Sequence, residues 1–208
     1  MNRASLAAVV LVGVLVGVAT AFVFTRTSPD PPALERATLF DAPRPLPAIA
    51  LVDQSGAAFD LERLRGHWTL LFFGFTNCPD ICPTTLVTLA ETRRLLADLP
   101  PAEVPEVVLV TVDPARDTPE ALARYVAHFD PSFAGVTGSR DSIDAFTREL
   151  GVAVLIGAPA QDGGYTVDHS AAIFLIDPAA AFTALIGTPH AAATIARDYR
   201  RIVAARVR

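Results

Sequence analysis

Three stretches of the chain are almost continuously apolar: residues 68–75, 107–112 and 171–176. Strands that helices cover on both faces have this composition, because neither face of such a strand meets water. The pattern therefore predicts that these three stretches are central strands of one sheet.

The segments between these stretches have apolar residues at helical spacing. Thr118-Pro119 and Thr188-Pro189 each offer a capping hydroxyl before a proline suited to the first helical position, and Gly151 is a suitable stop. Strands that alternate with helices predict an α/β sandwich. The apolar positions that define the helices are Leu86, Leu89, Leu96 and Leu99; Leu122, Val126 and Phe129; Ile143, Phe146 and Leu150; and Ile195, Tyr199 and Ile202.

The N-terminal segment has a different pattern. Residues 4–24 form a run of 21 uncharged residues, which as a helix spans roughly 30 Å, the thickness of a bilayer core. We interpret residues 1–25 as a retained membrane anchor. A cleaved signal peptide is the alternative, with Ala19-Thr20-Ala21 as the cleavage site. Arg3 and Arg26 flank the run on either side, so charge alone does not set the orientation.

Prolines dominate the segment after the anchor. Six of them lie between residues 29 and 47, and proline disfavours the interiors of helices and sheets. We therefore expect an extended linker over residues 26–46 and one folded domain over residues 47–208.

Composition and charge exclude several functions. The chain of 208 residues has a formal net charge of −5, and all its basic side chains except histidine are Arg. It lacks the basic field that attracts phosphate backbones, so no nucleic-acid partner is expected. The absence of Lys excludes Schiff-base catalysis and lysine-dependent phosphate loops.

Candidate chemistry begins with Cys78 and Cys82, the only two cysteines. They follow the first apolar strand, at the carboxyl end where α/β folds place their sites. With Pro83 as the first helical residue, Cys82 would lie beside the helix cap, where the dipole favours a thiolate. The spacing allows either a disulfide or a shared soft metal ion. A structural disulfide and inert buried thiols are the alternatives, although so short a loop gains little from a disulfide.

His169 is the candidate third ligand, at the entrance to the 171–176 strand. Two sulfurs and one imidazole suit Cu(I), and they also hold Cu(II), whereas structural zinc takes a fourth protein ligand. Asp168 is a candidate to orient the imidazole, and an ordinary surface role for it is equally open. We interpret the other histidines, His67, His128 and His190, as surface or boundary residues.

The chain resembles the Sco/SenC family, thioredoxin-like copper proteins that help to mature the dinuclear copper centre of cytochrome c oxidase. The resemblance rests on three segments in the family's order: Phe73-Gly74-Phe75-Thr76-Asn77-Cys78-Pro79-Asp80-Ile81-Cys82-Pro83, Val112-Asp113-Pro114-Ala115-Arg116-Asp117-Thr118-Pro119 and Val167-Asp168-His169-Ser170. The motif Cys-x-x-x-Cys alone is a moderate signal, and the three segments together are highly specific.

The resemblance implies a thioredoxin-like fold with a central mixed sheet flanked by helices. It also implies copper held by Cys78, Cys82 and His169, in a domain that faces the periplasm from an inner-membrane anchor. It does not assign a function to Asp113 or Arg116, for which capping and loop-fixing roles suffice.

Two functions follow as hypotheses. The first is a metallochaperone that delivers copper to a cytochrome c oxidase subunit, with periplasmic copper donors or thioredoxin-like reductases as further partners. The second is an enzyme, a thiol-disulfide oxidoreductase that uses Cys78 and Cys82 to reduce the copper-ligand cysteines of that subunit. Only the first requires His169.

Overall fold

The central strands lie where the apolar stretches predict them. The computed structural model describes residues 11–17, 33–158 and 164–206. In it β4 (Thr69–Gly74), β5 (Glu106–Thr111) and β9 (Ile173–Ile176) are adjacent in one sheet, and every residue of β4 and β9 is buried. Burial on both faces explains why the sequence of these strands lacks a polar alternation.

The sheet is mixed, as the family resemblance implies. β4, β5 and β6 (Ala134–Thr137) run parallel, whereas β9 pairs antiparallel with β4. The strand order is β1-β10-β9-β4-β5-β6-β2-β3. The other strands of the sheet are β1 (Ala37–Pro45), β2 (Leu51–Asp53), β3 (Ala58–Phe59) and β10 (Ala181–Ile186).

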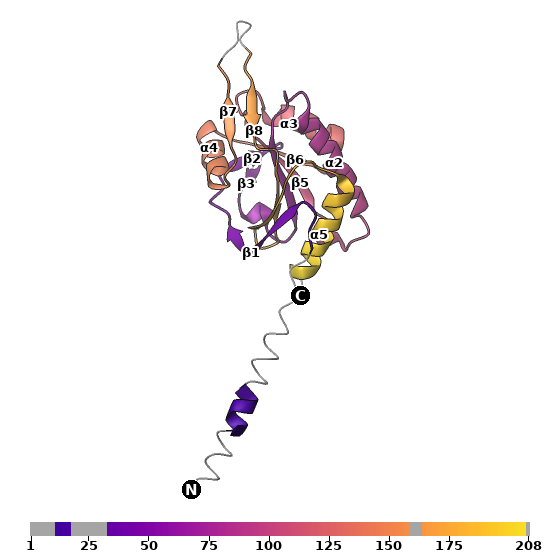
Figure 1. The fold of residues 1–208 in the computed structure, drawn as a ribbon. Helices are drawn as coiled ribbons and strands as arrows, with labels where there is room; N and C mark the ends of the chain where they lie inside the picture. Colours follow the sequence, from indigo (N-terminus) through magenta and orange to yellow (C-terminus); the bar gives the residue numbers. More distant parts are fainter. Residues whose placement is uncertain (1–10, 18–32, 159–163, 207–208) are drawn as a thin grey trace. The chain divides into compact units, whose positions relative to one another are not determined.

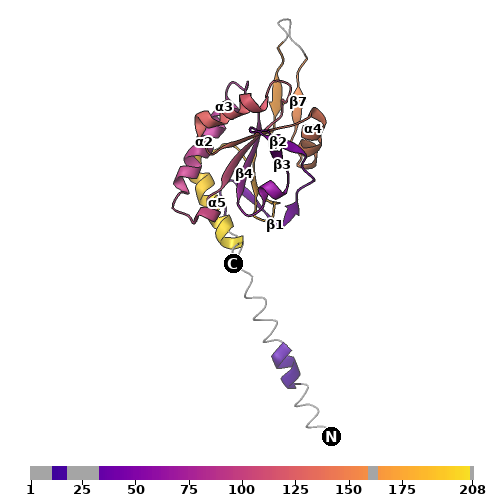
Figure 2. The same ribbon diagram turned by 180° about the vertical axis from the view of Figure 1, so that it is seen from behind.

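Four helices flank this sheet: α2 (Ile81–Leu95), α3 (Pro119–Phe129), α4 (Arg140–Glu149) and α5 (Ala192–Arg206). Figures 1 and 2 show α2, α3 and α5 on one side of the sheet and α4 on the other. Phe73 of β4 packs on Phe146 of α4, with ring centroids 5.6 Å apart. Short 3-10 helices in the described part of the chain are Glu62–Leu64 and Pro101–Glu103.

A separate two-stranded hairpin carries the candidate histidine. β7 (Val154–Ile156) pairs antiparallel with β8 (Val167–His169), and His169 lies opposite Val154. The hairpin projects from the sheet, as Figure 1 shows. Its last residue leads directly towards β9, so His169 lies at the base of the hairpin, next to the sheet.

Helix boundaries agree with two of the three sequence signals. The Thr118 hydroxyl accepts a hydrogen bond from the Ala121 N–H, and Pro119 opens α3. Gly151 follows α4 with a φ of 70°, the left-handed conformation expected after a helix end. The third signal was misplaced, because Thr188-Pro189 is a cis peptide in the loop before α5, and α5 begins at Ala192.

The predicted linker ends earlier than residue 46. The chain divides into units of residues 1–33 and 34–208, and the second unit includes β1, which pairs with β10. Pro43 and Pro45 fit within β1 because it lies at the edge of the sheet, where a missing N–H leaves no partner unpaired. The proline content was therefore a poor guide to the start of the fold.

The predicted membrane anchor lies largely outside the described residues. Of its span, residues 11–17 are described and are helical. Within the described ranges, no helix has the length and apolar character needed to cross a membrane. The anchor therefore stays a prediction.

Asp198 of α5 ties the start of the folded unit to its C-terminal helix. Its side chain is fully buried and accepts hydrogen bonds from the backbone N–H groups of Glu35, Arg36 and Ala37, at 2.9, 2.8 and 2.9 Å. These groups lie at the entrance to β1. The three N–H groups thus supply the hydrogen bonds that the buried carboxylate needs in place of water.

We predict that Asp198→Asn lowers the free energy of unfolding by about 2–3 kcal/mol, because the buried amide has one acceptor oxygen and points donors at the N–H groups of residues 35–37. Asp41→Asn, at an exposed position of β1, is the matched control and should change it by less than about 0.5 kcal/mol. Urea denaturation measures both. Equal stability of the two variants would contradict this role of Asp198.

Candidate metal centre

The two cysteines lie where the central strand β4 meets the helix α2. After Gly74 the chain turns, and the Cys78 N–H donates to the Phe75 carbonyl at 3.3 Å. Cys82 lies in the first turn of α2, and its backbone N–H donates to the Cys78 sulfur at 3.4 Å. Both side chains are free thiols and buried, with Cys82 fully enclosed.

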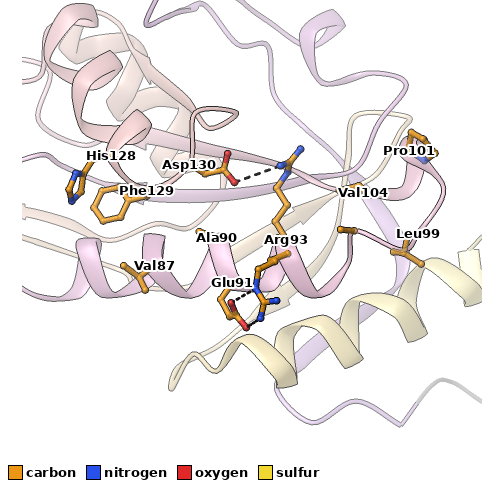
Figure 3. A pocket seen from close by; sticks show the side chains of 12 residues that line it. Val87, Ala90, Glu91, Arg93, Leu99, Pro101, Val104, His128, Phe129 and Asp130 are labelled. Atoms are coloured by element: carbon orange, nitrogen blue, oxygen red, sulfur yellow. Dashed lines mark hydrogen bonds and ion pairs between the residues drawn. The ribbon is translucent and has the colours of Figure 1, made fainter.

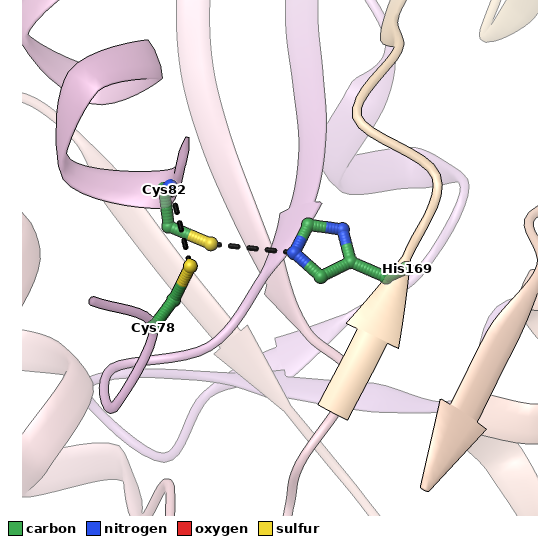
Figure 4. Close-up of side chains that lie close together, drawn as sticks. All are labelled: Cys78, Cys82 and His169. Atoms are coloured by element: carbon green, nitrogen blue, oxygen red, sulfur yellow. Dashed lines mark hydrogen bonds between the residues drawn. The ribbon is translucent and has the colours of Figure 1, made fainter. Parts of the chain in front are cut away.

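His169 brings the third donor to this place from the hairpin. Figure 4 shows its imidazole pointing at the two sulfurs from the end of β8. Its Nε2 lies 3.3 Å from the Cys82 Sγ. The ligand atoms of Cys78, Cys82 and His169 all lie within 4.8 Å of one another. The structure thus brings together the three side chains that the sequence analysis selected.

A backbone hydrogen bond sets the tautomer of His169. The imidazole Nδ1 lies 3.0 Å from the Ser170 carbonyl, which only accepts, so Nδ1 carries the hydrogen. Nε2 then presents a lone pair to the Cys82 sulfur, which donates its S–H or, without that proton, shares a metal with the imidazole. Asp168 was considered as the residue that orients the imidazole, but its side chain is exposed. The Ser170 carbonyl has this role instead.

Burial also sets the protonation of the site. It raises the pKa of the Cys82 thiol well above its ordinary value, and the contact with Cys78 adds to that rise. Burial lowers the pKa of His169, so the imidazole is neutral at neutral pH. The expected low pKa of Cys82 is therefore wrong for the metal-free protein, because desolvation outweighs the helix dipole. Moreover, α2 begins at Ile81 and not at Pro83.

The donor set fits a soft metal ion. Bonds of about 2.3 Å to sulfur and about 2.0 Å to nitrogen, as zinc makes, separate donors by about 3.7–4.0 Å in a trigonal arrangement. The observed separations of at most 4.8 Å need only small side-chain shifts to reach these values. Gly74 leaves space for this, since a Cβ there would lie 3.0 Å from the Cys82 sulfur.

The other histidines stay apart from this centre. His67 pairs with Glu106 at the opposite end of β4, and the His190 Nδ1 lies 3.4 Å from the Thr85 hydroxyl. His128 lines a groove of about 860 Å³ between α2 and α3, shown in Figure 3. Among the described residues, none of the three joins a cluster of potential metal ligands.

Two residues around the centre were missed in the sequence. Asp117 is fully buried and accepts hydrogen bonds from the Thr76 and Thr111 hydroxyls at 2.5 and 2.6 Å. Burial raises the pKa of Asp117, and these hydrogen bonds oppose the rise. Tyr165 precedes β8 and donates from its hydroxyl to Asp113 at 2.6 Å. Asp117 lies in a segment that carries the family resemblance, which was the available signal, whereas no pattern distinguishes Tyr165.

The fold and the site together define a thioredoxin-like α/β protein with a Cys-x-x-x-Cys pair and a histidine beside it. The SCO1/SenC family model matches residues 45–204. The chain belongs to the SCO1/SenC family.

Named relatives agree with this assignment. The copper-bound ScoI of Arabidopsis thaliana superposes with a TM-score of 0.71 at 31% identity, over 76% of this chain and 98% of that one. The copper-bound ScoI of Bradyrhizobium japonicum gives 0.68 at 34%, over 76% and 99%. The mitochondrial SCO2 homolog of Mus musculus is 40% identical over 157 residues, which are 76% of this chain and 62% of the mouse protein. The chain thus spans less than two thirds of that relative.

Protons should compete with metal at this centre. The raised pKa of Cys82 keeps its thiol protonated at neutral pH, so binding must displace that proton. We predict that affinity falls about tenfold per pH unit for each proton displaced as the pH decreases from about 8 to 6.5. His169 should not add to this loss in that range, because its pKa lies below the ordinary value. Chelator-competition titrations at several pH values measure it, and a pH-independent affinity would contradict it.

Proposed function

We propose that this chain binds copper through Cys78, Cys82 and His169, and that it delivers the copper to, or prepares, the dinuclear copper site of a cytochrome c oxidase subunit. The observation that supports it most is the convergence of the three donors within 4.8 Å of one another. Family membership supports the same reading, since the related ScoI proteins of Arabidopsis thaliana and Bradyrhizobium japonicum have copper-bound structures.

The donors favour copper over other metals. Thiolate sulfur is a soft ligand that selects Cu(I), and imidazole suits both copper oxidation states. Zinc in structural sites takes four protein ligands, whereas the described residues around this centre supply three. A centre with few ligands also suits a cargo that must leave, because an incoming ligand of a partner can add before a bound ligand departs.

We propose further that residues 4–24 anchor the protein in the inner membrane and that the folded domain faces the periplasm. The apolar length of this run supports a transmembrane helix. Orientation follows from the proposed chemistry, because the domain must face the compartment in which the oxidase subunit receives its copper. The copper-accepting subunit is then the principal partner, with periplasmic copper donors or thioredoxin-like reductases as further ones.

Thiol-disulfide exchange is the second candidate, and the free, adjacent thiols support it. Cys78 is the attacking residue, because burial holds the proton on Cys82. The Cys78 thiolate attacks a partner disulfide and releases one partner thiolate. Cys82 then gives its proton to the His169 Nε2, 3.3 Å away, and attacks Cys78. A Cys78-Cys82 disulfide forms, and the second partner thiol leaves reduced.

The variant His169→Ala separates the two functions. We predict that it weakens copper binding by more than the loss of a residue that only orients a metal ligand does. That loss is typically about 10- to 100-fold. Reduction of a model disulfide should continue at a lower rate, because solvent can accept the Cys82 proton. Chelator competition and a disulfide-reduction assay measure these effects. His128→Ala, at a histidine of the α2–α3 groove, is the control and should leave both unchanged.

Unchanged copper affinity in His169→Ala would reject the three-ligand centre and leave only the exchange function. Oxidation of Cys78 and Cys82 to a disulfide gives an independent check. It removes both thiolates, so the oxidised protein should retain no stoichiometric copper.

A further inference from the structure

The turn that follows β5 contacts both the loop that carries the cysteines and the hairpin that carries His169. Its backbone is closed on itself, because the Asp113 carbonyl accepts hydrogen bonds from the N–H groups of Arg116 and Asp117 at 3.1 and 3.0 Å. The Asp113 N–H in turn donates to the Thr111 hydroxyl at 2.9 Å. Both aspartates are fully buried. A rigid turn of this kind places its side chains at fixed positions relative to the sheet.

One side of the turn holds the cysteine loop. The Asp117 carboxylate accepts hydrogen bonds from the backbone N–H and the hydroxyl of Thr76, at 3.1 and 2.5 Å. Thr76 is the second residue before Cys78 and the second after the end of β4. The same carboxylate accepts from the Thr111 hydroxyl at the end of β5. Asp117 thus fixes the point at which the chain leaves the sheet to form the cysteine loop.

The other side of the turn holds the hairpin that carries His169. The Asp113 carboxylate pairs with Arg116 and accepts from the Tyr165 hydroxyl at 2.6 Å. The Arg116 guanidinium lies 3.9 Å from the centre of the Tyr165 ring and donates to the Tyr165 carbonyl at 3.4 Å. Tyr165 lies two residues before β8, whose last residue is His169. Ring, hydroxyl and backbone of Tyr165 are therefore all held by the turn.

We propose that the turn 113–117 is a positioning element that sets the distance between the cysteines and His169, with Asp117 acting on the cysteine loop and Asp113 and Arg116 acting through Tyr165 on the hairpin. This inference rests on the proposed function of the three ligands. Cys78 and Cys82 follow β4, whereas His169 comes from a hairpin outside the main sheet. β9 begins four residues after His169 and holds the hairpin from that side, so the turn supplies a second connection, made before β8.

The alternative is that these contacts only stabilise the fold. Tyr199 provides a matched comparison, because its hydroxyl is also hydrogen-bonded, to the Glu103 carbonyl at 2.5 Å, and its ring packs on Trp68 before the other end of β4. Loss of either hydroxyl removes one hydrogen bond. Only loss of the Tyr165 hydroxyl should affect the ligand distance.

The test measures copper affinity of the reduced protein by chelator competition in Tyr165→Phe and Tyr199→Phe, each alone and combined with His169→Ala. We expect Tyr165→Phe to weaken binding by about 10-fold, the lower range for partners of metal ligands, and Tyr199→Phe to leave it unchanged. In the His169→Ala background, Tyr165→Phe should cause no further loss, because Tyr165 acts through the histidine.

Asp117→Asn tests the other side of the turn. Its loss of affinity should persist in the His169→Ala background, because Asp117 acts through the cysteine loop. It should also shift the reduction potential of the Cys78-Cys82 pair, whereas Tyr165→Phe should not. Arg116→Gln should weaken binding at least as much as Tyr165→Phe, because Arg116 also pairs with the buried Asp113 and lies 5.8 Å from the centre of the Phe75 ring. Arg200→Gln, which removes a comparable contact to Asp98 and the Leu95 carbonyl, should leave copper affinity unchanged.

The proposal would be overturned if the loss of copper affinity in Tyr165→Phe added fully to the loss in His169→Ala. It would also be overturned if Tyr165→Phe kept the full copper affinity while His169→Ala bound copper weakly. Hydrogen exchange of the metal-free protein separates this failure from failure of the proposed function. If His169→Ala bound copper normally, the ligand assignment would fail, yet faster exchange of the β8 amides in Tyr165→Phe than in Tyr199→Phe would still support the positioning role. Equal exchange in the two variants would overturn it.

Discussion

The contact between the Cys82 sulfur and the His169 Nε2, at 3.3 Å, joins two parts of the chain that are far apart in sequence. Cys82 is fixed by the first turn of α2, while His169 comes from a hairpin outside the main sheet. The proposed chemistry depends on this contact, because copper binding as proposed needs Cys78, Cys82 and His169 together. The contact in turn depends on the sheet, since β4 leads into the cysteine loop and β9 follows directly after the histidine.

Burial shifts the pKa values of Cys82 and His169 in opposite directions, and both shifts suit the proposed release of the metal to a partner. A lowered pKa keeps His169 neutral and able to ligate, whereas a raised pKa keeps a proton on Cys82 until a metal displaces it. Cys82 and His169 are therefore both uncharged in the metal-free protein, and the rings of Phe72 and Phe75 lie 6.0 and 5.9 Å from the imidazole. Deprotonation and metal binding are thus expected to occur together.

The sequence predicts the parts of the fold whose cause is local or strongly patterned. The continuous apolar stretches identified β4, β5 and β9, and Thr118 marked the start of α3. The three ligands were selected because their residue types suit copper and because they lie next to predicted strands, and the family resemblance implies the same set. β1 was missed because its prolines suggested a linker, and edge strands tolerate proline. The pKa of Cys82 was predicted in the wrong direction because helix position is visible in a sequence, whereas enclosure by distant segments is not. Tyr165 was missed for the same reason, since its partners Asp113 and Arg116 lie about fifty positions away in the chain.

X-ray absorption of the reduced protein loaded with one equivalent of copper tests whether Cys78, Cys82 and His169 all bind the metal. We expect two sulfur ligands at about 2.3 Å and one nitrogen at about 2.0 Å, close to the distances that zinc makes to these donors, with outer-shell scattering from an imidazole that disappears in His169→Ala. A sulfur-only spectrum that is the same in the two proteins would show that His169 is not a ligand.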